Sequence, residues 1–155
     1  MRARLQGGFT ATEMMIVVAI VGIVTAIAAP NMADMIKVQR VRAAAFDIVA
    51  GLTQARSEAL KRNQNVTITP NSSSWANGWI TKDNSGNIVQ QQGPFTCSSC
   101  TFTGPGSVTY TSSGRLPAGT AAPQFQVTST SIDASKYRCI NVDLSGRPVT
   151  TLGAC

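Results

Sequence analysis

The feature that most constrains this chain is an apolar run close to its N-terminus. Between Met14 and Ala29 only Gly22 and Thr25 interrupt the hydrophobic residues. Counted from Phe9, the segment reaches the roughly 20 residues that a helix needs to cross the hydrocarbon core of a bilayer. The run therefore predicts a membrane helix, with the remainder of the chain forming a separate head.

The residues ahead of the run are typical of a targeting segment. Arg2 and Arg4 precede it without any acidic residue, which is the basic start that the secretion machinery recognises. An ordinary signal peptide carries its small-residue cleavage site after the apolar core. Here the small residues Gly7 and Gly8 come before it, so cleavage would leave the apolar helix on the mature protein.

Glu13 is the one acidic residue at the edge of this segment. A carboxylate in a membrane helix costs about 2.5–3.5 kcal/mol or more unless it finds a partner. If the chain is cut between Gly8 and Phe9, the new amine of Phe9 lies one helical turn away and can pair with Glu13, in the same copy or a neighbouring one. The alternative is that Glu13 simply reaches the polar interface.

Gly8-Phe9-Thr10, followed by Glu13 and an apolar helix, resembles the class III signal of type IV prepilins and type II secretion pseudopilins. The resemblance implies a dedicated prepilin peptidase that cuts after Gly8, N-methylation of Phe9, and a role for Glu13 in filament assembly. The chain departs from the commonest form of the signal, because Ala11 and Thr12 stand where leucine and isoleucine are usual.

The orientation of the span also follows from this resemblance rather than from charge. Arg2 and Arg4 precede the span, but Lys37, Arg40 and Arg42 follow it, so the distribution of positive residues does not decide the topology. The family signal places the N-terminus in the cytoplasm. All four cysteines lie beyond the span, which suits an oxidising compartment on the far side.

A second helical pattern continues beyond Pro30. Apolar residues recur at spacings of three and four, which predicts an amphipathic helix whose stripe is covered by the head. The stripe consists of Val38, Val41, Ala45, Ile48, Leu52, Ala55 and Ala59. The pattern stops after Arg62, at Asn63-Gln64-Asn65.

The residues after 62 predict short strands separated by turn signals. The expected strands are Val66–Thr69, Gly78–Lys82, Asn87–Gln91, Ser107–Thr111, Gln124–Thr130, Arg138–Leu144 and, more weakly, Pro148–Thr151. Helix first and strands afterwards indicate an α+β fold, with a mostly antiparallel sheet packed on the helix. The expected organisation is a leader at 1–8, a transmembrane and filament-core helix at 9–29, an amphipathic helix at 30–62 and a β-rich head at 63–155.

Several motifs of the head resemble the GspH/FimT branch of pilin-like proteins. They are Ala55-Arg56-Ser57-Glu58-Ala59-Leu60-Lys61-Arg62-Asn63, Val66-Thr67-Ile68, Trp75-Ala76-Asn77-Gly78-Trp79, and Cys139-Ile140-Asn141-Val142 leading to Ser145-Gly146-Arg147. The resemblance implies the type IV pilin fold. For the individual residues a simpler interpretation exists, in which Arg56 and Glu58 solvate the helix end and both tryptophans wedge the sheet against the helix.

Composition excludes much of enzyme chemistry. The chain has no histidine, so histidine bases, Ser-His or Cys-His dyads and histidine metal sites are absent. Removing residues 1–8 takes away Arg2 and Arg4, which leaves 11 basic against 7 acidic residues, a net charge of +4. We expect a protein that is not an enzyme and has no cofactor and no metal.

The four cysteines allow three disulfide pairings. Cys97-Ser98-Ser99-Cys100 has the spacing of a thiol oxidoreductase, but such a site needs a helix N-terminus, and the following Gly104-Pro105-Gly106 favours a loop staple instead. We favour Cys97–Cys100 with Cys139–Cys155, the second because pilins of this superfamily often tie the C-terminal end back onto a strand. A zinc site made from all four thiolates is a more distant alternative.

The basic residues of the head raise a second hypothesis. Some minor pilins on the FimT side of the branch bind double-stranded DNA through a C-terminal Gly-Arg-x-Arg motif. This chain has Gly146-Arg147-Pro148-Val149 and so lacks the second arginine. Because phosphate binding depends on the number of cations delivered, Arg115, Lys136 and Arg138 would have to share a surface with Arg147. The alternative is that these charges only keep the surface soluble.

The sequence thus predicts a minor pilin of the GspH/FimT type. It would be processed in the bacterial inner membrane, with its head in the periplasm, and then be incorporated with other major and minor pilins into a type IV pilus or its tip-initiating complex at the cell surface. The alternatives are a pilin that binds double-stranded DNA during natural transformation, and a minor pseudopilin of type II secretion.

Overall fold

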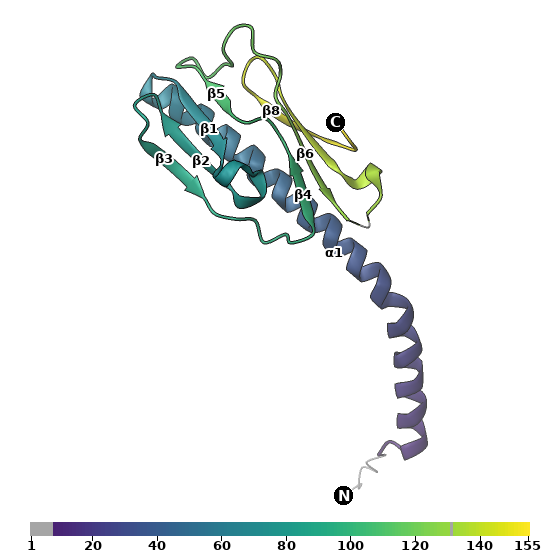
Figure 1. Cartoon of the computed structure of the whole chain (residues 1–155). Coiled ribbons are helices and arrows are strands. Elements are labelled where there is room, and N and C mark those ends of the chain that lie inside the picture. The colour runs from purple at the N-terminus through teal and green to yellow at the C-terminus, as the bar shows by residue number, and fades with distance from the viewer. Residues whose placement is uncertain (1–7, 131) are drawn as a thin grey trace, which may run out of the picture. The chain divides into compact units, whose positions relative to one another are not determined.

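The computed structural model describes residues 8–130 and 132–155. Arg2, Arg4, Gly7 and most of the expected leader therefore lie outside the described residues. The chain divides into two compact units, Met1–Met35 and Ile36–Cys155, and a single long helix, α1 (Ala11–Arg62), contributes to both (Figure 1).

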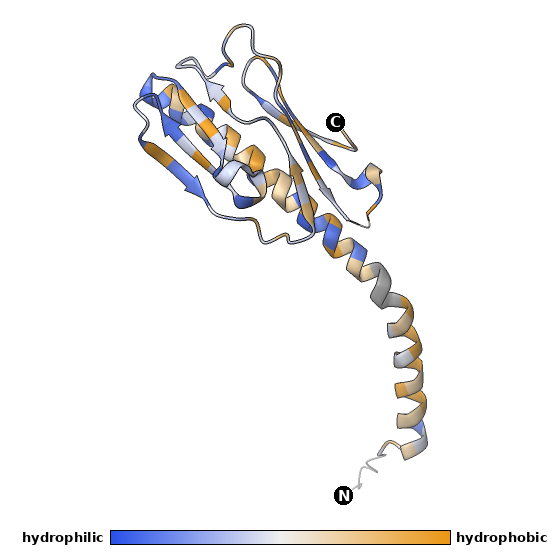
Figure 2. Cartoon of the chain, viewed as in Figure 1, coloured by the Kyte–Doolittle hydropathy of each residue, from blue (hydrophilic) through white to orange (hydrophobic). Residues whose placement is uncertain are grey.

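The described part of the first unit is the apolar beginning of α1. Its large hydrophobic side chains between Met14 and Ile27 are all 52% to 75% exposed, and Figure 2 shows this part of the ribbon as almost continuously hydrophobic. No described helix meets the requirements for a membrane span by itself. Ala11–Ile27 and Met32–Arg62, joined as a bent pair, do meet them by length and composition.

In the second unit, α1 buries one stripe of its surface. Val41, Ala45, Ile48, Leu52, Ala55 and Ala59 are at most 2% exposed, which confirms the amphipathic pattern from Val41 onward. The helix ends where Asn63 adopts a φ of 53° and the Gln64 amide donates to the carbonyl of Ala59. This closure satisfies a carbonyl that the last helical turn would otherwise leave free.

The head consists of two antiparallel sheets of four strands each. The first has the order β3 (Ile88–Gln92), β2 (Trp79–Asp83), β1 (Val66–Pro70) and β5 (Val108–Tyr110). The second has the order β4 (Cys100–Thr103), β6 (Gln124–Ser129), β7 (Arg138–Val142) and β8 (Pro148–Leu152). Short 3-10 turns lie at Asn71–Ser73, Trp75–Asn77 and Ala134–Lys136.

The α+β class and the helix packed on antiparallel strands are therefore as predicted, but two details were wrong. The strands form two sheets instead of one, and β4 was not predicted. Four residues that follow a disulfide loop and precede Gly104-Pro105-Gly106 carry little local signal. What makes them a strand is distant pairing with β6, in which Phe102 lies opposite Val127.

Both sheets contribute to one core with the helix. Ile68, Val108 and Tyr110 of the first sheet join Phe125, Val127, Ile140 and Val142 of the second in a single buried cluster with α1. The tryptophans pack between these layers. The Trp79 ring packs directly on Gly51 of α1, where an added Cβ atom would lie only 2.5 Å from the ring. Trp75 meets Phe125 edge-on with centroids 4.8 Å apart and donates from Nε1 to the Pro105 carbonyl at 2.8 Å.

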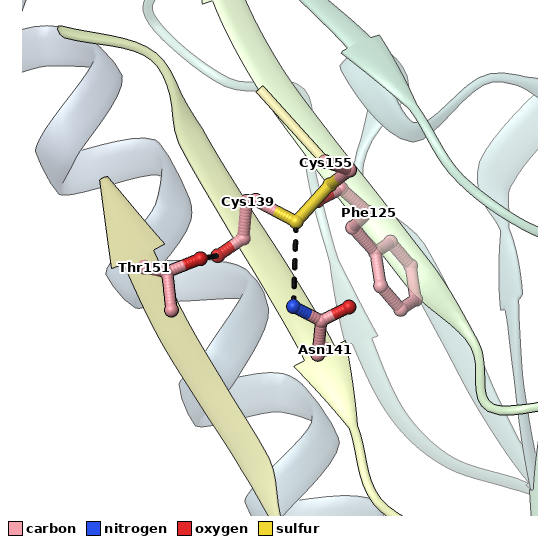
Figure 3. Close-up of a disulfide and its surroundings, with 5 residues drawn as sticks. All are labelled: Phe125, Cys139, Asn141, Thr151 and Cys155. Atoms are coloured by element: carbon pink, nitrogen blue, oxygen red, sulfur yellow. Dashed lines mark hydrogen bonds between the residues drawn. A yellow bond between two sulfur atoms is a disulfide. The ribbon is translucent and has the colours of Figure 1, made fainter. Parts of the chain in front are cut away.

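Both favoured disulfides are present, Cys97–Cys100 and Cys139–Cys155. The second fastens the C-terminal end of the chain to the central strand β7 (Figure 3). Around it, the Asn141 side-chain amide donates to Cys139 Sγ at 3.5 Å. Cys155 Sγ lies 3.2 Å from the Phe125 carbonyl oxygen, so the terminal residue reaches across β7 to β6.

Candidate functional site

The first candidate site is the segment at the start of the described chain where the sequence predicts a processing signal. Gly8 is exposed, and a Cβ atom built on it would meet nothing within 4 Å. Phe9 is 81% exposed. The bond between them is therefore uncovered by any described part of the protein.

Glu13 has a definite partner in the structure, Thr10. The backbone amide and hydroxyl of Thr10 donate to Glu13 Oε2 at 2.8 and 2.9 Å, and the Glu13 amide donates to Thr10 Oγ1 at 3.2 Å. This reciprocal arrangement is a capping box, which satisfies free amides at the helix start. Thr10 was not among the partners expected for Glu13, which were Phe9 and the polar interface, although the T-x-x-E spacing is the signal of a capping box.

The second candidate site is built from hairpin turns of the head. Three turns share one construction, in which the amide of the first residue donates to the carbonyl of the fifth, and the glycine at the fourth position donates back to the first. They are the turns 83–87, 111–115 and 143–147. The glycines have φ values of 84°, 70° and 83°, which only glycine adopts readily.

Two of these turns carry the same tripeptide and lie against each other. They are Ser113-Gly114-Arg115 and Ser145-Gly146-Arg147, which we call the paired arginine turns. A Cβ atom on Gly146 would lie 2.2 Å from the Gly114 carbonyl oxygen, so the two backbones are in contact. The structure therefore brings Arg115 and Arg147 to neighbouring positions.

A third arginine supports the paired arginine turns from the helix. Arg56 donates from Nε to the Gly114 carbonyl at 2.9 Å, so it is a structural clamp and does more than solvate the helix end. Beneath the turns lies Tyr110, which is fully buried and whose hydroxyl has no hydrogen-bond partner among the described atoms. Burial raises the pKa of Tyr110, and the charge of Arg56 opposes this rise.

The charges of the two exposed arginines are not equivalent. Asp143 Oδ1 accepts from the Arg147 amide at 3.0 Å, and Asp143 Oδ2 lies 3.6 Å from Arg147 Nε. A hydrogen bond from Ser145, the Arg147 amide and the Arg147 charge hold the pKa of Asp143 below its usual value. The Arg147 side chain is still 71% exposed. Arg115 is also exposed, and among the described residues its guanidinium has no ion pair or hydrogen bond.

The structure separates the other two cations of the hypothetical DNA patch from Arg147. In the β7–β8 hairpin, Val142 pairs with Pro148 beside the turn, whereas Arg138 pairs with Leu152 at the opposite end. Four residues of strand correspond to about 13 Å. Lys136 lies still farther along the chain, in a 3-10 turn beside Asp133. Of the four expected residues, only Arg115 and Arg147 share one end of the head.

A groove of about 490 Å³ adjoins the paired arginine turns. It lies between the loop of residues 115–121 and Leu144, and its walls mix polar and apolar atoms. Leu144 is 57% exposed. The groove gives this end of the head a concave, partly apolar surface that has Arg115 in its lining.

All four cysteines are paired in disulfides in the structure. Cys97 and Cys100 form a turn closed by the bond from the Cys100 amide to the Cys97 carbonyl, and Cys100 begins a strand, so no helix N-terminus activates either sulfur. With the four sulfur atoms in two disulfides, no four-thiolate zinc site is formed in this structure. Over the described range, no cluster of three or more His, Cys, Asp or Glu side chains could hold a metal ion.

Comparison with known proteins agrees with this architecture. Residues 44–146 match the family model described as type II transport protein GspH. Crystal structures of the type IV minor pilin FimU from Pseudomonas aeruginosa PAO1 share the fold. One has a TM-score of 0.62 at 20% identity, covering 75% of this chain and 90% of FimU. A second crystal form gives 0.59 at 21% identity, covering 71% and 91%. No curated protein sequence matches the chain significantly.

Proposed function

The chain belongs to the family of type II transport protein GspH, and from this premise we propose that it is a minor pilin incorporated into a type IV pilus or its tip-initiating complex. Pilins and pseudopilins are structural proteins, so this chain is not an enzyme. Their assembly depends on contacts with other pilins or pseudopilins, which are therefore its partners.

The observation that carries the proposal is the exposed apolar beginning of α1. Ten large hydrophobic side chains between Met14 and Ile27 are each more than half exposed, although each fully buried side chain of this size would gain about 1.5–3 kcal/mol. Nothing among the described residues covers them. Lipid before assembly and neighbouring subunits after assembly would supply the missing cover.

In the proposed function, the residues at the start of the chain have roles in processing and assembly. In the proposed function the peptidase cuts between Gly8 and Phe9, and Phe9 becomes the N-methylated first residue. Cleavage creates a positively charged amine close to the capping box of Thr10 and Glu13. Glu13 can then exchange Thr10 for the Phe9 amine of its own or a neighbouring copy, which makes it an assembly residue.

The proposed cleavage and assembly also imply where the protein is located in the cell. The protein would span the bacterial inner membrane with residues 9–29, keep its N-terminus in the cytoplasm and fold residues 30–155 in the periplasm, where both disulfides form. It would reach the cell surface only within the filament.

The experiment is to follow the full chain in cells that assemble pili. Wild type, Gly8→Val and Glu13→Val are compared by the mass of the membrane protein and by its amount in sheared filaments. We expect a mass loss corresponding to residues 1–8 in wild type and none in Gly8→Val, whereas Glu13→Val should be cleaved but absent from filaments. Uncleaved wild type, or Glu13→Val present in filaments at the wild-type amount, would contradict the proposal.

A second candidate function, binding of double-stranded DNA, is favoured by one observation. The paired arginine turns place Arg115 beside Arg147, so the chain can present two cations despite its incomplete Gly-Arg-x-Arg motif. With two phosphate contacts the logarithm of affinity should fall with that of salt with a slope of about −2, and loss of one arginine should reduce the slope by about 1.

A mobility-shift titration at several salt concentrations tests this alternative. Arg115→Gln and Arg147→Gln should each weaken binding of the full chain and flatten its salt dependence. Lys82→Gln removes an exposed cation from β2, which is separated from β5 by β1 in the first sheet, and serves as the control. Equal binding by all four proteins, or no binding at low salt, would leave the structural role alone.

The third candidate, a minor pseudopilin of type II secretion, shares every feature of the fold. A deletion strain distinguishes it, because loss of pili with normal secretion supports the pilus subunit, whereas loss of secretion with normal pili supports the pseudopilin.

A further inference from the structure

A small basic notch lies where α1 meets the β7–β8 hairpin. Its cavity of about 20 Å³ is lined by Arg42, Ala45 and Phe46 from the helix and by Arg138 and Thr150 from the hairpin. The Arg42 guanidinium carbon lies 5.5 Å from the centre of the Phe46 ring, and Phe46 is 54% exposed. We call Arg42, Phe46 and Arg138 the basic notch.

The charges of the notch are not neutralised within the described chain. Among the described residues that line it, two are positively charged and none is acidic. Neither Arg42 nor Arg138 forms an ion pair with any described residue. Arg138 Nε is buried and has no hydrogen-bond partner in the described part of the chain. A buried charged donor without an acceptor is costly, so an anion from outside the chain would be stabilised here.

The other flank of the helix differs in this respect. There Arg40 lines a hollow together with Asp47, so an acidic side chain of the same chain lies beside that arginine. Arg40 is therefore not counted as part of the basic notch, which is the side of α1 left with uncompensated positive charge.

The shape of the notch suits a phosphate oxygen that belongs to a larger, partly apolar molecule. A space of this size admits about one oxygen-sized group, and guanidinium groups are the donors that bind phosphate most specifically. The exposed Phe46 ring beside them offers an apolar contact. Basic side chains next to an exposed phenylalanine are typical of surfaces that bind the headgroup region of a membrane.

The notch also lies close along the chain to the segment proposed to enter the membrane. Exposed large hydrophobic side chains continue beyond residue 29, at Met32, Met35 and Ile36. Arg42 follows Ile36 by six residues, or about 9 Å of helix. The polar headgroups extend about 5–7 Å beyond the hydrocarbon core on each side, and the long arginine side chain spans the remaining distance.

The proposed topology makes these charges unusual. Lys and Arg residues close to a span are normally concentrated on the cytoplasmic side. Here Lys37, Arg40 and Arg42 follow the span and would face the periplasmic leaflet. Anionic headgroups in that leaflet would attract them.

We propose that the basic notch binds the phosphate of an anionic phospholipid in the periplasmic leaflet of the inner membrane. Arg42 and Arg138 hold the phosphate, and Phe46 packs against the apolar part of the lipid. The contact keeps the head beside the bilayer before assembly, and extraction of the subunit into a filament breaks it. This inference rests on the proposed function, which places the apolar segment in the membrane and the head in the periplasm.

The experiment reconstitutes the full chain, with photoreactive benzoylphenylalanine at Phe46, into vesicles of phosphatidylcholine alone or mixed equally with phosphatidylglycerol. After irradiation, mass spectrometry identifies the lipid joined to the chain. In the mixed vesicles we expect the phosphatidylglycerol adduct at least about fivefold more often than the phosphatidylcholine adduct. Arg42→Gln and Arg138→Gln should each lower the phosphatidylglycerol yield about fivefold, because each removes one cation near an anionic surface.

Two controls come from the opposite end of the head. Ile88 is exposed and pairs with Lys82, beside the turn that Asp83 ties to Arg62 at the end of α1. The photoprobe at Ile88 should give no lipid adduct, and Lys82→Gln should leave the yield from Phe46 unchanged.

Several results would overturn the proposal. They are no lipid adduct at Phe46, equal labelling of the two lipids in the mixed vesicles, or a link from Phe46 to a second copy in place of lipid. An undiminished phosphatidylglycerol adduct in Arg42→Gln, whose side chain is exposed, would overturn it even if Arg138→Gln failed to fold.

The two proposals fail separately. If the chain is cleaved and present in sheared filaments but Phe46 does not label phosphatidylglycerol, the proposed function stands and this inference falls. If the chain is absent from filaments, the vesicle experiment still decides whether the notch binds an anionic lipid.

Discussion

At the scale of single residues, the glycine at the fourth position of a hairpin turn has two separable roles. Gly86 and Gly146 have nearly the same φ, 84° and 83°. A Cβ atom on Gly86 meets nothing within 4 Å, whereas one on Gly146 would overlap the Gly114 carbonyl oxygen. Gly86 is needed only for its positive φ, whereas Gly146 is needed both for its positive φ and for the close approach of the Gly114 backbone.

Gly86→Ala should therefore cost only the strain of a left-handed residue, about 1 kcal/mol. Gly146→Ala adds a backbone overlap and should cost at least about 2 kcal/mol more, because the paired arginine turns must move apart. Urea unfolding of the two variants measures the difference. Equal losses of stability would show that the turns are not in contact in solution.

Tyr110 offers a second test at this scale. Its ring is fully buried, but its hydroxyl lacks a partner among the described atoms. Removing an unsatisfied buried hydroxyl costs little or is favourable, so Tyr110→Phe should leave the melting temperature unchanged or raise it. Tyr110→Ala leaves a cavity and should cost about 3–5 kcal/mol. A large loss in Tyr110→Phe would reveal a bound water or a partner for the hydroxyl.

The paired arginine turns were only partly predictable from the sequence. Arg115 and Arg147 were both recognised as candidates, and the repeated Ser-Gly-Arg tripeptide is visible in the sequence. That the two turns touch depends on packing between residues 32 positions apart (Gly114 and Gly146), which no local pattern encodes. For the same reason neither the family motif nor the simpler interpretation of Arg56 as a solvating charge predicted that it clamps one of the turns.

At the scale of elements, the end of α1 is joined to the β2–β3 turn by charge. Glu58 accepts from Arg62 Nε at 2.8 Å, and Arg62 also lies 3.8 Å from Asp83. Hydrogen bonds from Asn87 and from the Ser85 amide keep the pKa of Asp83 below its usual value, and the positive charge of Arg62 acts in the same direction. The carboxylate thus orders the turn and ties it to the helix.

This arrangement predicts how stability depends on pH. Since the pKa of Asp83, Asp133 and Asp143 is lowered by folding, their contribution is complete above the unfolded value near 3.8 and is lost as pH falls through the lower folded values. Asp83→Asn should destabilise the head at pH 7 and differ less from wild type at pH 2 to 3. Thermal melts of wild type and Asp83→Asn across this pH range measure the difference in stability. A difference that does not change with pH would contradict the proposed role of the Asp83 carboxylate.

The strands illustrate what local patterns can and cannot predict. Seven of the eight strands were predicted with bounds close to those observed, because turn residues such as Asp83-Asn84-Ser85-Gly86 separate alternating runs. β4 was missed and the strands were assigned to one sheet, since both features depend on pairing partners. The stripe on α1 was predictable because its period reports burial directly.

The Cys139–Cys155 disulfide should matter more for stability than Cys97–Cys100. The sequence separations are 16 and 3 residues. In the chain-entropy model the longer loop contributes about 3 kcal/mol, and the short one less. Replacing Cys139 and Cys155 by serine should lower the melting temperature more than replacing Cys97 and Cys100. The reverse order in calorimetry would contradict the expectation.

At the scale of the whole molecule, the second unit contains the core that stabilises the fold, whereas the first unit carries the exposed apolar surface proposed for assembly. Every residue of the hydrophobic core cluster lies beyond residue 36. A chain that begins at Ile36 should therefore fold by itself and melt cooperatively, with both disulfides formed. The full chain should need detergent, because its apolar segment has no cover. A truncated head without a cooperative transition would show that the first unit contributes to folding.

The C-terminal disulfide also has a mechanical consequence. In the proposed role of a pilus subunit the chain would carry load, and a pull between α1 and Cys155 would enter the head at β7 through Cys139 and bypass the hairpin that the disulfide closes. Those 16 residues cannot lengthen while the bond is intact, which withholds about 55 Å of extension at roughly 3.4 Å per residue. Under tension the oxidised head would thus behave as a shorter tether than its sequence suggests, and only reduction would release the remainder.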